Sequence, residues 1–235
     1  MDPTEILKAA PEIQKIATTI VAGVPLAEIV KRIVLPSADV LGQRMANRVE
    51  RCFEKTAKMI EDAGTTPQPV ADKLVFTILR GASLEDNEDL HTMWAALLAN
   101  AANTSQSEVL PSFTDLLRQL SSGEAMFLNT VYNAHQAYLA ATKHETDFVV
   151  NSATLFDIYL QSMPVQRTVE IFNPIVDDLQ RMGLLGRRLT ALATPHYDGL
   201  LPDFALKPAQ ADYGYHLTAY GLRFLTACRP PTAKS

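Results

Sequence analysis

The sequence predicts a mainly α-helical protein, a helical bundle followed by a winged-helix-like C-terminal module with a small β-wing. Apolar residues recur at helical spacing as far as about residue 142, and 47% of the 235 residues are hydrophobic, enough for a sizeable core. After residue 150 the pattern becomes helix, helix, strand, long loop, strand, helix, the order of a winged-helix module. The expected parts are N-terminal amphipathic helices at 1–64, a Pro-rich linker at 65–69, an acidic helical core at 70–142 and the winged-helix-like module at 150–229.

The N-terminal part has the pattern of amphipathic helices separated by prolines. Residues 11–20 predict a helix, and Pro25 interrupts the run. From Leu41 apolar residues recur every three or four positions until Gly64, which we expect to end the helix. A bundle helix with a solvated charged face and a helix that binds a membrane surface or a partner share this pattern, so both interpretations stay open. The outer face is basic and is a candidate contact for a partner or a polyanion through Arg44, Arg48, Arg51 and Lys55.

The early apolar stretch at residues 16–27 is too short to cross a membrane. A helix of this length extends about 18 Å, against about 30 Å of hydrocarbon. Peripheral membrane contact through residues 13–60 stays open as an alternative. Met1 is not followed by a positively charged segment, and the two cysteines lie too far apart in sequence to suggest a disulfide framework. We therefore expect a cytoplasmic protein, with a position peripheral to the inner membrane as the alternative.

The middle of the chain is acidic. Residues 61–165 carry a net charge of −9, whereas the segments before and after it each carry +2. We expect a helix over residues 70–79 that Gly81 ends, and a second helix that Ser83 opens, with Asp86 three positions on in a capping box. The acidic residues of this first turn suit the positive end of the helix dipole, so they require no metal ion.

A buried central helix is predicted by residues 91–102, which are apolar on almost every side. Asn100 is polar at an inward position, and we expect it to serve as a structural cap. Another helix is predicted to begin at Pro111 and to reach Leu120. Ser121 and Glu124 then form a second capping box for a helix that runs to about residue 141.

The C-terminal part combines helix and strand signals. Residues 152–162 predict a helix, and Asn173 followed by Pro174 predicts the start of the next one. Strands are expected at 184–194 and 213–217, on either side of a long loop. Thr218 is expected to cap the last helix.

The charge of this module disfavours nucleic acid as a partner. A DNA-reading helix contacts phosphates through lysine and arginine. The corresponding helix here carries Asp177 and Asp178 against Arg181, and Arg187 and Arg188 follow at the base of the wing. We therefore expect a protein partner or self-association, with Arg181, Arg187 and Arg188 as candidate contact residues.

Sequence motifs for common chemistries are missing. The ten glycines form no phosphate-binding loop, there is no Gly-x-Ser-x-Gly elbow, and the five histidines show no metal-ligand spacing. His144 and Asp147 lie close enough in sequence for an acid–base pair, but such a lone pair usually arises by chance. Cys52 lies on an apolar stripe, as a core residue does. We predict that the protein is not an enzyme and that it uses no metal and no cofactor.

One block of sequence resembles a known family. Residues 83–103 read SLEDNEDLHTMWAALLANAAN, and PSF at 111–113 and LTAYGLRF at 217–224 follow. This combination resembles the abortive infection alpha family over roughly residues 40–228. The resemblance implies a bacterial protein linked to defence against phage, and it implies no catalytic residues. The positions that carry the family pattern are Asp86, Trp94, Asn100, Pro111 and Phe113.

These observations together predict a non-enzymatic protein of phage defence that acts through protein or membrane-surface contacts. Two alternatives stay open. One is a winged-helix regulator that binds DNA, and the other is an enzyme whose site has no recognisable motif.

Overall fold

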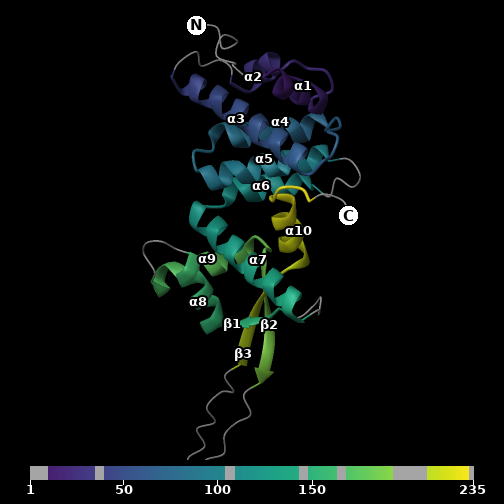
Figure 1. The fold of residues 1–235 in the computed structure, drawn as a ribbon. Coiled ribbons are helices and arrows are strands. Elements are labelled where there is room, and N and C mark those ends of the chain that lie inside the picture. The colour runs from purple at the N-terminus through teal and green to yellow at the C-terminus, as the bar shows by residue number, and fades with distance from the viewer. Residues whose placement is uncertain are drawn as a thin grey trace, which may run out of the picture. The chain divides into compact units, whose positions relative to one another are not determined.

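The computed structural model describes residues 10–34, 40–103, 109–142, 148–162, 168–192 and 211–232. These residues form ten helices and one three-stranded antiparallel sheet, which confirms the mainly helical class (Figure 1). The contacts divide the chain into two compact units, Met1–Ala125 with Arg223–Ser235, and Met126–Leu222. This division differs from the expected one, which placed a boundary at the linker 65–69.

The first three helices belong to the core of the first unit. They are α1 (Pro11–Ile20), α2 (Leu26–Val34) and α3 (Val40–Asp62), and α3 packs against α4 and α5. Ile20, Ile29 and Phe53 are fully buried. Burial of these side chains favours the bundle-helix interpretation, because the rest of the unit covers them.

The proline linker is extended, as expected, but it is held in place. Pro67 forms an isolated bridge with Asn103, and the Gln68 amide donates to the Ala102 carbonyl. The Val70 amide donates to the Ile20 carbonyl at 2.9 Å. These backbone bonds tie the linker to the end of α5 and to α1.

The boundary between the next two helices differs from the prediction. Helix α4 (Asp72–Leu84) continues through Gly81. Helix α5 (Glu88–Ala102) begins after Asn87, whose side-chain oxygen accepts from the amides of Asp89 and Leu90. A Cβ on Gly81 would overlap the Trp94 ring. The glycine thus permits close packing of α4 on α5 and does not end a helix. Ser83 donates to the Arg80 carbonyl and caps nothing, and Asp86 lies one residue before the actual cap.

Two further helices follow the predicted signals. Helix α6 (Pro111–Gln119) begins at its proline, and α7 (Ser122–Thr142) begins with the predicted capping box. The Glu124 carboxylate accepts from the Ser121 amide and hydroxyl, both at 2.7 Å. In the first unit, Phe113 packs edge-on against Phe224 of α10 (Ala219–Ala227), with ring centroids 5.5 Å apart.

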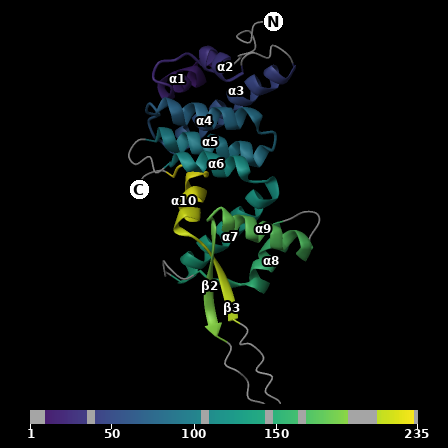
Figure 2. The same cartoon turned by 180° about the vertical axis from the view of Figure 1, so that it is seen from behind.

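The second unit contains the sheet. Its elements after α7 are β1 (Val150–Asn151), α8 (Ser152–Ser162), α9 (Val169–Arg181), β2 (Leu185–Leu192) and β3 (Ala211–Leu217). The strand order is β1-β3-β2, and Figure 2 shows β2 and β3 side by side. The two longer strands and α8 confirm the prediction, whereas the short β1 was not predicted. The expected loop between the longer strands lies outside the described residues, as do His144 and Asp147.

Helix α9 begins earlier than Asn173 and Pro174 predict. Pro174 lies inside the helix, which starts at Val169 after Thr168. The additional turn buries Phe172 among Phe127, Phe156 and Tyr159, with ring centroids 5.1–6.2 Å apart. Burial of a phenylalanine stabilises by about 1.5–3 kcal/mol, which offsets much of the roughly 3 kcal/mol that a proline costs inside a helix.

Candidate functional site

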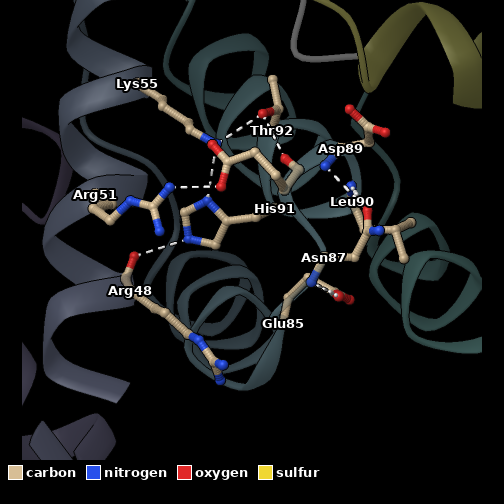
Figure 3. A network of polar contacts seen from close by, with 10 residues as sticks. Arg48, Arg51, Lys55, Glu85, Asn87, Asp89, Leu90, His91 and Thr92 are labelled. Atoms are coloured by element: carbon tan, nitrogen blue, oxygen red, sulfur yellow. Dashed lines mark hydrogen bonds and ion pairs between the residues drawn. The ribbon is translucent and has the colours of Figure 1, made fainter. Parts of the chain in front are cut away.

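A cluster of titratable side chains lies between α3 and α5 (Figure 3). Helix α3 contributes three cations at spacings of three and four residues, so they share one face. Helix α5 contributes three polar residues at spacings of three and one, which lie on the side of α5 that faces α3. The two sets are Arg48, Arg51 and Lys55, and Glu88, His91 and Thr92.

Lys55 is the centre of this cluster. Its ammonium group lies 2.6 Å from Glu88 Oε1, 2.8 Å from Thr92 Oγ1 and 3.3 Å from His91 Nδ1. An ammonium group has three donors, and each has a partner here. The Lys55 side chain is only 22% exposed, so these contacts replace most of its hydration.

The surroundings of His91 define its tautomer. Nε2 lies 3.0 Å from the Arg48 carbonyl oxygen, which can only accept, so Nε2 carries the proton. Nδ1 is then an acceptor for Lys55. Burial lowers the pKa of His91, and the charges of Lys55 and Arg51 act in the same direction. The hydrogen bond to the Arg48 carbonyl opposes this shift but does not reverse it, and His91 is neutral at pH 7.

Glu88 joins the cluster to the surface. Its second carboxylate oxygen accepts from Arg51 at 2.5 Å, in an ion pair whose side chains are both more than half exposed. The hydrogen bond from Lys55 lowers the pKa of Glu88, and the bond from Arg51 adds to this effect. Because Glu88 is exposed, solvent screens these interactions, and they orient the helices more than they stabilise them.

The cluster has little capacity for catalysis in this arrangement. Both ring nitrogens of His91 and all three donors of Lys55 point at other groups of the protein. A general base needs a nitrogen that can reach a substrate proton. Among the described residues, no three His, Cys, Asp or Glu side chains are grouped to hold a metal ion. The arrangement joins α3 to α5.

Three of the four candidate basic residues of α3 are thus occupied by contacts within the unit. Arg48 also donates to the Ser83 carbonyl at 3.4 Å. Arg44 is exposed, and its side chain has no polar partner in the described part of the chain. Of the basic face predicted from the sequence, Arg48, Arg51 and Lys55 thus contact α4 or α5, whereas Arg44 and Arg51 remain exposed.

The candidate residues of the second unit lie on two elements, α9 and β2. Arg181 pairs with Asp178 at 2.7 Å on α9. Arg187 stacks over the Tyr213 ring at 4.0 Å, and Arg188 is exposed on β2. Arg181 therefore lies on α9, whereas Arg187 and Arg188 lie on β2.

The positions of the family pattern lie mostly in the core of the first unit. Trp94 and Phe113 are almost fully buried, and Pro111 begins α6. The Asn100 amide donates to the Ala227 carbonyl at 3.0 Å and to the Arg229 carbonyl at 2.7 Å. Asn100 thereby caps the C-terminal end of α10, a structural role.

The sequence did not predict two arrangements, because each joins residues that lie far apart along the chain. The first is the contact between Lys55 and His91, which are separated by 36 positions. Its only signal in the sequence is the helical spacing of the polar residues of α5, which places them on one face of that helix. The second arrangement is a groove between α4 and α6. It has a volume of about 590 Å³ and is lined by Phe76, Thr77, Arg80, Gly81, Leu84 and Arg118.

None of the helices in the described part of the chain combines the length and the apolar character needed to cross a membrane.

Comparison with known proteins identifies the family. The abortive infection alpha family model matches residues 39–228. No curated protein and no solved structure matches the chain. The matched range covers most of the chain, including α3, the cluster on α5 and the sheet of the second unit. The chain therefore belongs to the abortive infection alpha family.

Proposed function

We propose that this protein acts in phage defence by abortive infection and that it does so through contacts with protein. Membership of the abortive infection alpha family over residues 39–228 is the observation that carries the proposal. The cluster around Lys55 supports a non-enzymatic role, because its donors and acceptors are used in packing α3 on α5.

Burial of the N-terminal apolar faces favours protein over membrane as the target. Ile20, Ile29 and Val49 have no exposed surface, so these apolar side chains of α1, α2 and α3 are not available to insert among lipids. Flotation of the full chain with anionic vesicles tests this choice. We expect the chain to stay with the unbound fraction, and co-flotation that salt does not reverse would favour the membrane alternative.

Phage challenge tests the proposed function itself. The full chain is expressed in a phage-sensitive bacterium, and plaque number, phage released per infected cell and culture density are measured. We expect fewer plaques and, at several phages per cell, death of the infected culture with little phage release. Equal plaque numbers and equal release with and without the chain, across a panel of phages, would contradict the proposal.

A DNA-binding regulator is the second candidate, favoured by the topology of the second unit. The element order α7, β1, α8, α9, β2 and β3, with the sheet order β1-β3-β2, supports a winged-helix interpretation of this unit. In that arrangement α9 is the helix that reads DNA. Its carboxylates oppose this use, since Glu170 and Asp177 are exposed on it and would repel phosphates.

Binding to random duplex DNA distinguishes the two candidates. We expect no binding at low salt. Binding whose affinity falls steeply with salt, and which weakens in Arg187→Ala with Arg188→Ala, would favour the regulator.

A further inference from the structure

The groove between α4 and α6 is a basic and apolar surface on an otherwise acidic part of the chain. Residues 61–165 contain only four cations, of which Lys143 lies outside the described residues. Arg80 and Arg118 line the groove. Lys73 lies on the same face of α4, two helical turns before Arg80.

These cations are available for a partner. Neither Lys73 nor Arg80 has a side-chain polar partner in the described part of the chain, and both are exposed. Arg118 has a loose, exposed contact with Asp115 at 3.5 Å. Beside them Leu84 is 57% exposed, an unusual value for a large apolar side chain. The groove therefore offers cations around an apolar wall.

The exposed face of α9 has the complementary character. Glu170 and Asp177 are separated by two turns and lie on one face, with Pro174 between them. Ile171 next to them is 37% exposed. Asp177 has no polar partner among the described residues. This face therefore presents two carboxylates, and Ile171 lies at its border, about 100° around the helix from Glu170.

The spacing of the charges also matches. Seven residues separate Glu170 from Asp177 and Lys73 from Arg80, about 10.5 Å along each helix. When the two helices run antiparallel, Glu170 meets Arg80 and Asp177 meets Lys73. A helix seated in an apolar groove with charged edges is a common mode of protein recognition.

We propose that α9 of one copy of this chain docks in the α4–α6 groove of a second copy. The inference deepens the proposed function, on which it rests, because it names the protein contact as self-association. The two surfaces differ, so the contact is heterologous. Each added copy leaves one groove and one α9 face open, and the assembly grows into a ring or a chain.

Charge-reversal variants of the full chain test the contact. Their association is measured by sedimentation velocity at low salt and at increasing protein concentration. The groove variant carries Arg80→Glu and Arg118→Glu, and the α9 variant carries Glu170→Lys and Asp177→Lys. We expect wild type to assemble and salt to reverse the assembly. Each variant alone should associate more than tenfold more weakly, because its two surfaces then have the same sign. An equimolar mixture of the two variants should assemble again.

Matched controls change the same charge elsewhere. Arg44→Glu with Lys58→Glu reverses two exposed cations of α3, and Glu54→Lys with Glu61→Lys reverses two exposed acids of the same helix. Both controls should assemble like wild type. Loss of assembly in a control would show that net charge alone governs association, and this result would overturn the inference.

A disulfide trap tests the geometry. Cys52 and Cys228 are buried, so new surface cysteines dominate the chemistry. In the proposed register Asn173 of α9 lies opposite Thr77 of the groove, so the full chain with both Thr77→Cys and Asn173→Cys should form covalent dimers and higher species under mild oxidation. The variant with Thr77→Cys alone should not, and a covalent dimer of that variant would point to a symmetric contact instead.

The inference fails if wild type stays monomeric at all concentrations, if either reversed variant assembles normally, or if the mixture does not assemble. Phage challenge separates its failure from that of the proposed function. A monomeric chain that still restricts phage leaves the proposed function intact, whereas an assembling chain without effect on phage contradicts only the proposed function.

Discussion

At the scale of single residues, close packing decides what Gly81 does. The residue lies inside α4, and the Trp94 ring occupies the space where its Cβ would be. Gly81→Ala improves helix propensity by up to about 1 kcal/mol, but overpacking costs about 1–3 kcal/mol. We expect a net loss of stability in urea denaturation. The loss should shrink in a Trp94→Phe background, where the smaller ring leaves room, and an equal loss there would contradict the assigned contact.

His91 makes stability depend on pH. Its folded pKa lies below the ordinary value of about 6.5, so the unfolded state binds more protons as pH falls. The free energy of unfolding should therefore be highest above pH 7 and should decline as pH drops through 6.5. Protonation would place a proton on Nδ1 against the Lys55 ammonium group.

The measurement is urea denaturation from pH 8 to pH 5 for wild type and His91→Gln. The glutamine amide can donate to the Arg48 carbonyl and accept from Lys55 without titrating. We expect a smaller decline in the variant. Burial also lowers the pKa of His135, which leaves a residual slope in both proteins. Identical slopes would exclude the assigned state of His91.

At the scale of elements, Asn100 ties α5 to the end of α10. Its amide donates to carbonyls at positions 227 and 229, beyond the last helical hydrogen bonds. Asn100→Ala should cost about 1–3 kcal/mol, because these carbonyls lose their partner. Asn100→Asp should cost more, since a carboxylate would face carbonyl oxygens. Urea denaturation gives both values, and equal stability of Asn100→Asp and wild type would contradict this account.

The boundaries of the elements show where local signals suffice. The capping box of Ser121 and Glu124 forms as predicted, because both partners lie within one turn. Thr218 likewise caps α10 by accepting from the Gly221 amide at 2.8 Å. The predictions from Gly81 and from Asn173 with Pro174 are wrong, because Trp94 and the aromatic cluster around Phe172 decide those sites.

At the scale of the whole molecule, the two cysteines report on cooperative unfolding. Burial raises the pKa of Cys52 to about 12 and raises that of Cys228 further. Thiolates react and thiols do not, so both side chains should resist a thiol reagent at pH 8 in the folded protein. Denaturant should expose both together, because both belong to the first unit. Fast labelling of one cysteine under native conditions would reveal local opening of its surroundings.

The sequence by itself determined the helical class, most helix ranges, the two long strands and the family. These properties depend on periodicity, caps and motifs, which act over a few residues. It did not determine which charged residues would be used in packing. Arg51 and Lys55 had the pattern of a solvent-facing basic surface, yet both pair with Glu88.

Only the tertiary structure decided three features: these pairings, the groove between α4 and α6, and the burial of the N-terminal helices. Each depends on which helix packs beside which, and residues 33 or more positions apart carry no local signal of that choice. An amphipathic helix has the same sequence pattern whether it covers a core or a membrane. Its neighbours in the fold make the difference, and here α4 and α5 cover α3.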